Sequence, residues 1–161
     1  MRQFASKFMG PQGDRLFSCG AGLGTCLDAY GKAQMCMLLR HPDTIYPLDE
    51  ELHKKRHPNT TLSPLEYALN VFFLTVREMR SQNPDYLQRC AKCFLQGLCE
   101  QCPAKSWEEH GTLDTPVEYL CEVAHAQGRY LDLLREGEKA WLLPEATWRK
   151  RLKSFTIAFE A

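Results

Sequence analysis

The sequence predicts a small α+β fold in which an N-terminal β-hairpin is followed by helices and cysteine-rich loops. Three stretches carry this prediction: a turn-centred segment at 18–38, a helical apolar pattern at 63–82 and four cysteines in the thirteen residues 90–102. With 161 residues the chain can bury a modest apolar core in one domain. We therefore expect a lead-in at 1–17, one domain over 18–135 and a C-terminal tail of undefined structure at 136–161.

The charge balance narrows the classes of partner. The chain has 20 basic residues (Lys plus Arg) and 20 acidic residues (Asp plus Glu), so its formal net charge is zero. Such a balance gives no reason to expect a nucleic acid or a membrane surface as partner. No apolar run approaches the ~20 residues that span a bilayer, and the first residues lack the apolar core of a signal peptide. We expect a cytoplasmic protein, in which clustered cysteines more often bind metal than form disulfides.

Residues 18–38 have the pattern of a β-hairpin with arms at 22–27 and 32–38. Asp28 and Gly31 occupy the first and last turn positions, where a type I turn favours them. Three cysteines fall in or beside this hairpin, which can present their thiolates to one centre: Cys19, Cys26 and Cys36.

Residues 40–62 are polar and interrupted by prolines, so we expect an extended connection. Three histidines lie here, namely His41, His53 and His57. We favour solvated loop side chains over metal ligands, because no histidine pair has ligand spacing beside a cysteine.

The clearest predicted helix covers residues 63–82. Ser63 and Glu66 form a capping box, and Pro64 occupies the first helical position. Apolar residues at helical spacing predict a face buried in the core: Leu65, Leu69, Phe72, Phe73, Val76 and Met79.

A second helix is expected after a similar capping box at Thr115 to Glu118. Its inward stripe consists of Val117, Leu120, Cys121 and Ala124. Cys121 should then face the core and the cysteine loop; the alternative is an ordinary buried thiol. His125, one turn later, is more typical of a packed or ligand-supporting group than of a ligand.

The cysteine loop between these helices has the spacing C-x2-C-x5-C-x2-C. Its members are Cys90, Cys93, Cys99 and Cys102, and Gly97 lets the backbone turn within it. Pairs at C-x2-C spacing can direct two thiolates at one metal centre, as in iron–sulfur and zinc sites. In the tail, the basic run at 149–153 is typical of a solvated face, and the alternating Phe155, Ile157 and Phe159 favour a terminal strand.

The order of the cysteines resembles a known family. Cys19-x11-Gly31-x4-Cys36, Cys90-x2-Cys93-x5-Cys99 and a closing Cys121 resemble the SPASM domain, the C-terminal auxiliary-cluster domain of radical S-adenosylmethionine enzymes. The resemblance covers about residues 17–128. The chain departs from the family in having two residues, not three, before Cys102.

This resemblance implies two auxiliary [4Fe–4S] clusters with interleaved ligands. The first would use Cys19, Cys26, Cys36 and Cys102, and the second Cys90, Cys93, Cys99 and Cys121. The implied role is electron transfer or substrate positioning in peptide or protein modification. No C-x3-C-x2-C loop occurs in the chain, so we expect no catalytic residue here. S-adenosylmethionine would be bound only by a radical S-adenosylmethionine barrel domain or protein acting as partner.

Two other functions fit part of the pattern. One is a zinc-binding interaction module with four-cysteine sites, since the local pairs also suit zinc. The other is a thiol oxidoreductase, which we favour least because Cys90-Ala91-Lys92-Cys93 lies inside a larger cysteine set. The complete cysteine order favours iron–sulfur clusters over both.

Overall fold

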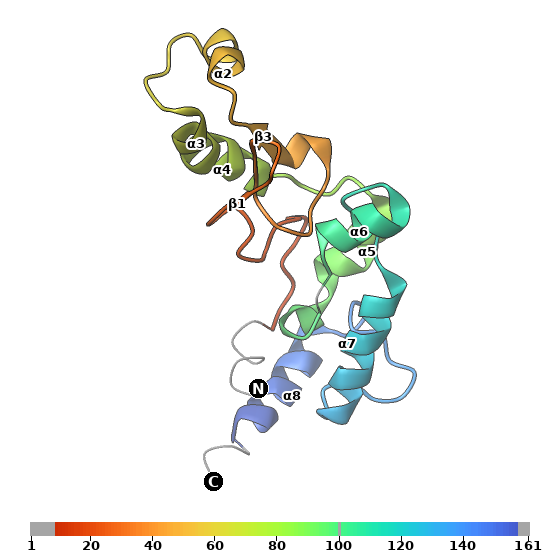
Figure 1. Ribbon diagram of the computed structural model, residues 1–161. Helices are drawn as coiled ribbons and strands as arrows, with labels where there is room; N and C mark the ends of the chain where they lie inside the picture. The colour runs from red at the N-terminus through yellow and green to blue at the C-terminus, as the bar shows by residue number, and fades with distance from the viewer. Residues whose placement is uncertain (1–8, 100, 158–161) are drawn as a thin grey trace. The chain divides into compact units, whose positions relative to one another are not determined.

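The chain has an α+β fold, which confirms the predicted class. The computed structural model describes residues 9–99 and 101–157 (Figure 1). Within them, three short strands form one antiparallel sheet in the order β1-β2-β3: β1 (Cys26–Leu27), β2 (Lys32–Gln34) and β3 (Ile45–Pro47). In the described part of the chain, no helix is long and apolar enough to cross a membrane.

Helices make up most of the remaining regular structure. The α-helices are α2 (Glu50–Arg56), α3 (Pro64–Tyr67), α4 (Phe73–Arg77), α5 (Pro84–Gln88), α6 (Pro103–His110), α7 (Glu118–Tyr130) and α8 (Glu145–Ile157). Short turns of other helix types are η1 (Pro42–Thr44), η2 (Ala68–Phe72), η3 (Cys90–Lys92) and η4 (Phe94–Gly97).

The chain divides into two compact units, each built from separate stretches of sequence. The sheet unit comprises Arg15–Arg80 and Cys102–Leu113, and the cysteine-loop unit comprises Met1–Asp14, Ser81–Gln101 and Asp114–Ala161. Compact units within a chain of this length are not by themselves separate domains. The expectation of one domain over 18–135 stays a prediction.

In the sheet unit, β1 and β2 form the predicted hairpin. Leu27 pairs with Ala33, and Ala33 pairs with Tyr46 of β3. The turn depends on Asp28, whose Oδ1 accepts hydrogen bonds from the backbone N–H groups of Tyr30 and Lys32 at 2.9 Å each. This side chain therefore fixes the register of the hairpin, as an Asx turn does.

The expectation of an extended connection at 40–62 is wrong, because this stretch contains η1, β3 and α2. Asp49 accepts a hydrogen bond from the N–H of Leu52 at 2.7 Å and so caps α2. Pro42 and Pro47 stand at the start of η1 and the end of β3, where proline is tolerated.

Of the three histidines of this stretch, His53 is buried, which corrects the expectation of a solvated side chain, whereas His41 and His57 are half-buried. His53 is buried, with Nδ1 2.7 Å from the Tyr46 hydroxyl and Nε2 3.0 Å from the Leu62 carbonyl. The His57 ring stacks on Tyr67 at 4.2 Å between centroids, and His41 meets Trp107 edge-on at 4.5 Å. Each of the three rings therefore has a packing or hydrogen-bonding partner within the sheet unit.

The helical region at 63–82 starts as predicted but is shorter and less regular. Ser63 and Glu66 form the capping box. The helix then continues through the π-helical η2 into α4, which ends at Arg77. Of the predicted apolar face, Phe73 and Val76 are buried, whereas Leu65 is exposed.

The cysteine-loop unit has a core beneath the cysteine loop. Its buried members are Cys93, Phe94, Leu95, Leu133, Leu134, Ala140 and Trp148. The rings of Phe94 and Trp148 stack 5.5 Å apart and almost parallel. Trp148 belongs to α8, so the C-terminal segment packs directly on the cysteine loop.

Two predictions for this unit need correction. The described end of the predicted strand, 155–157, lies in helix α8, while Phe159 lies outside the described residues. Helix α7 begins at Glu118 with Val117 as its cap, two residues after the predicted Thr115. Thr115 does not cap this helix, because its Oγ1 accepts a hydrogen bond from the Asn83 side chain instead. The N–H of Val117 donates to Gln101 Oε1 at 3.1 Å.

Acid should weaken the attachment of α8. Arg151 Nη1 and Nη2 lie 2.5 and 2.9 Å from the carboxylate of Glu138, and this pairing lowers the pKa of Glu138 to about 2. A pKa below the ordinary value of 4.5 means that the ionised carboxylate stabilises the folded state above about pH 4.5 and that this stabilisation is lost as the pH falls towards 2.

Urea unfolding of wild type and Glu138→Gln from pH 7 to pH 3 tests this expectation. The difference between the two unfolding midpoints should shrink as the pH falls. Glu145→Gln, which removes the exposed pair with Arg149, is the control and should show little difference at any pH. A Glu138→Gln difference that stays constant with pH would contradict this account.

Candidate metal centre

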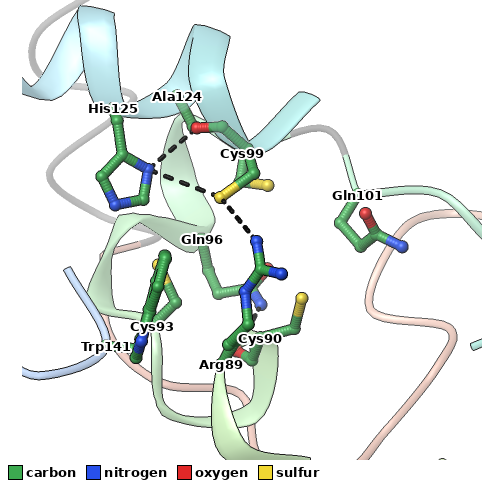
Figure 2. Close-up of a pocket in the computed structure, with 10 residues that line it drawn as sticks. Arg89, Cys90, Cys93, Gln96, Cys99, Gln101, Ala124, His125 and Trp141 are labelled. Carbon is green, nitrogen blue, oxygen red and sulfur yellow. Dashed lines mark hydrogen bonds between the residues drawn. The ribbon is translucent and has the colours of Figure 1, made fainter. Parts of the chain in front are cut away.

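Four cysteines from two segments of the cysteine-loop unit line one cavity (Figure 2). Cys90 begins η3, Cys93 lies between η3 and η4, and Cys99 follows η4. Cys121 comes from the first turn of α7. The structure thus places in one cavity the same four residues that the family resemblance implies for the second cluster.

The loop conformation follows from the residues between the cysteines. The N–H of Cys93 donates to the Cys90 carbonyl at 3.2 Å, and that of Cys99 donates to the Leu95 carbonyl at 2.9 Å. Phe94 and Leu95 are fully buried in the core. Burying these two side chains fixes the loop on the side away from the cavity, which leaves its thiols to line the cavity.

Burial favours the protonated form of three of these thiols, those of Cys90, Cys93 and Cys121. Desolvation, followed by the neighbouring thiols, raises the pKa of Cys90 and of Cys93 to about 12. Burial also raises the pKa of Cys121, although the Arg89 guanidinium opposes this. Only thiolates bind metal, so a metal or cluster bound here must displace protons from neutral thiols.

Arg89 is the one cation that contacts a thiol among the described residues lining this cavity. Its Nη2 lies 3.7 Å from Cys121 Sγ and 2.9 Å from Glu118 Oε2, and its Nη1 lies 3.2 Å from Asp85 Oδ2. Its Nε is buried and has no hydrogen-bond partner among the described residues. Glu118 and Asp85 therefore hold the guanidinium in place and leave one buried donor without an acceptor.

His125 contacts Cys121 from one turn further along α7. Its Nε2 accepts the N–H of Ala140 at 3.1 Å, which assigns the ring proton to Nδ1 in the neutral form. Nδ1 lies 2.8 Å from the Cys121 carbonyl and 3.6 Å from Cys121 Sγ. Burial lowers the pKa of His125, which favours this neutral form.

Trp141 forms a further wall of the cavity. The Arg89 guanidinium lies 4.9 Å from the centre of its ring, and His125 meets the ring edge-on at 5.2 Å. Arg89, Cys121, His125 and Trp141 also line an adjoining groove of about 500 Å³. The Cys121 side of the cavity therefore faces a groove large enough for a small molecule or a peptide side chain.

The other four cysteines all belong to the sheet unit. Cys26 lies in β1, Cys36 follows β2, and Cys102 directly precedes α6. Cys19 is exposed, and its carbonyl accepts a hydrogen bond from Arg77 Nη1 at 3.1 Å. The unit boundary between Gln101 and Cys102 thus separates the eight cysteines into the two sets of four that the resemblance implies.

Neither set has the spacing of a site for one metal ion. Among residues 9–99 and 101–157, no group of three or more His, Cys, Asp or Glu side chains is arranged to hold a single ion. The shared cavity has a volume of about 20 Å³, which is room for one water molecule.

The chemistry of the donors fits an iron–sulfur centre. Four thiols are the ligand set of a [4Fe–4S] cluster, and hydrogen bonds to its sulfur atoms adjust its properties. The buried Arg89 Nε lacks an acceptor in the described structure, and a cluster offers sulfur acceptors. The residues that would hold the group are Cys90, Cys93, Cys99 and Cys121.

Sequence reasoning did not identify Arg89 or Trp141 as parts of this site. Arg89 directly precedes Cys90, which is a local signal that points to the cavity only once the turn is known. Trp141 lies in a segment without periodicity and reaches the site through the packing of the C-terminal segment. Comparison with protein-family models, with curated proteins and with solved structures gave no match.

Proposed function

We propose that Cys90, Cys93, Cys99 and Cys121 hold a [4Fe–4S] cluster and that the chain is an auxiliary iron–sulfur protein of the radical S-adenosylmethionine/SPASM type. One observation carries this proposal: four thiols, from a loop and from a helix about twenty residues later, line the same cavity. An ordinary buried thiol does not account for four of them in one place. The similarity in cysteine order supports the same assignment.

The order of the cysteines along the chain favours a cluster over zinc. The four thiols taken alone also suit a zinc site with four cysteine ligands. The preference for a cluster therefore rests on the resemblance of the whole cysteine order to the SPASM domain. A zinc-binding interaction module remains the alternative, and the metal analysis below distinguishes it from a cluster-binding protein.

The proposal includes a second [4Fe–4S] cluster, which the sheet unit would bind. Its ligands would be Cys19, Cys26, Cys36 and Cys102, which lie in the same compact unit. This assignment rests on the family resemblance and on that shared unit. The observation on the cavity applies to the cysteine-loop unit alone.

The proposed role is electron transfer or substrate positioning in peptide or protein modification. A cluster supplies one-electron transfer when bound. The groove beside Cys121, which is lined mostly by charged side chains, would be the surface presented to a partner. A radical S-adenosylmethionine barrel, as a domain or a separate protein, would bind S-adenosylmethionine and carry the catalytic step. This role places the protein in the cytoplasm, where thiols stay reduced.

Metal analysis of the reconstituted protein tests the proposal. After anaerobic incubation with iron and sulfide, the wild-type chain should be brown and contain about eight iron and eight sulfide per chain, the content of two [4Fe–4S] clusters. Cys99→Ala should lose about half of both, because one of the two ligand sets is broken.

Gln96→Ala is the matched control, since Gln96 lines the same cavity without offering a thiol. It should retain the iron and sulfide of the wild type. A colourless wild-type protein that binds zinc at about one ion per four cysteines would instead support the interaction module and contradict the cluster.

Paired substitutions test the interleaved assignment. Cys36→Ala combined with Cys102→Ala should remove one cluster, because both residues serve the sheet unit. Cys36→Ala combined with Cys121→Ala should remove both clusters. Electron paramagnetic resonance of the reduced proteins distinguishes the outcomes. The reverse pattern would mean that Cys102 serves with Cys90, Cys93 and Cys99, in order of sequence.

A further inference from the structure

Two side chains lie within hydrogen-bond distance of the Cys121 thiol. Arg89 Nη2 lies 3.7 Å from its Sγ and His125 Nδ1 lies 3.6 Å from it, both within hydrogen-bond distance of sulfur. The two donors approach the thiol from different elements, Arg89 from the end of α5 and His125 from α7 (Figure 2).

Both donors are fixed by further contacts. Glu118 accepts two bonds from the Arg89 guanidinium, at 2.5 and 2.9 Å, and Trp141 lies against the guanidinium. The backbone N–H of Ala140 is bonded to His125 Nε2, which leaves Nδ1 as the donor. The Nδ1–H is shared between the Cys121 carbonyl at 2.8 Å and Cys121 Sγ at 3.6 Å. Cys121 Sγ is the thiol that both donors reach.

We infer that Arg89 and His125 are positioning residues that raise the reduction potential of the cluster proposed in the cysteine-loop unit by donating hydrogen bonds to the Cys121 thiolate. The inference rests on the proposed function. Reduction adds one electron and thus one negative charge to a sulfur-ligated centre, and that charge is shared with its thiolates. A cationic donor and a neutral N–H donor therefore stabilise the reduced state more than the oxidised one.

The buried Nε of Arg89 extends this role. Nε has no acceptor among the described residues, although Arg89 lines the cavity. A buried donor without an acceptor is unfavourable, because it has lost its hydrogen bond to water. A sulfur atom of a bound centre supplies an acceptor for it, so binding the centre removes part of this cost. Arg89 then contributes both to holding the centre and to setting its potential.

Potentiometric titration followed by electron paramagnetic resonance tests the inference on the full chain. In wild type, Arg89→Gln, Arg89→Lys and His125→Phe, iron and sulfide content are measured first. Arg89→Gln and His125→Phe should keep the cluster and shift one midpoint potential to more negative values, while the other midpoint stays unchanged. Arg89→Lys, which keeps the charge but loses the planar fork, should give a smaller shift.

Lys139→Gln is the matched control. Lys139 lies in the groove beside Trp141 and acts on Cys121 through its charge, without a hydrogen bond to the thiol. Its removal should move the midpoint less than Arg89→Gln does. An equal shift would mean that general charge, and not the hydrogen bond, sets the potential, and this would overturn the inference.

Three further outcomes are decisive. Full iron content with unchanged midpoints in Arg89→Gln and His125→Phe overturns the inference and leaves the proposed function intact. If every Arg89 and His125 variant loses the cluster while Lys139→Gln retains it, the two residues are needed to hold the cluster and not to set its potential. That result also overturns the inference. A wild-type chain that takes up no iron contradicts the proposed function itself.

Discussion

The burial of Phe94 and Leu95 is the interaction on which the candidate centre depends. These two residues lie between Cys93 and Cys99 and are fully buried in the core with Trp148 of α8. The loop around them consists of short η3 and η4 turns with few internal hydrogen bonds, so side-chain burial has to fix its course. Because the apolar side chains occupy the core, the thiols of the same loop line the cavity beside it.

The same burial determines the chemistry of the thiols. Removing Cys90 and Cys93 from water raises the pKa of both to about 12, so the metal-free site holds neutral groups. Thiolates form there only when a cation compensates their charge. Arg89 supplies a permanent positive charge next to Cys121, and Glu118 keeps it in place. The Arg89 guanidinium would thus stabilise negative charge on this sulfur.

Local signals in the sequence predicted some parts of this structure and missed others. The turn at Asp28, the capping box at Ser63 and the inward position of Cys121 follow from residue patterns within one or two turns. Helix α2 was missed because a single cap, Asp49, marks its start. Strand β3 and helix α8 were missed because they depend on residues distant in the sequence, through the pairing of Tyr46 with Ala33 and the stacking of Trp148 on Phe94. In the site, the cysteines were identifiable from their spacing. Arg89 and Trp141 became identifiable only through tertiary packing.

Iron-edge X-ray absorption of the reconstituted Cys36→Ala chain tests the central claim most directly, because this variant retains the four thiols of the cysteine-loop unit. The account predicts iron surrounded by sulfur, with a strong signal from neighbouring iron atoms at short distance, as in a [4Fe–4S] cluster. Iron bound by nitrogen and oxygen without an iron neighbour, or a protein that retains only zinc, would contradict it.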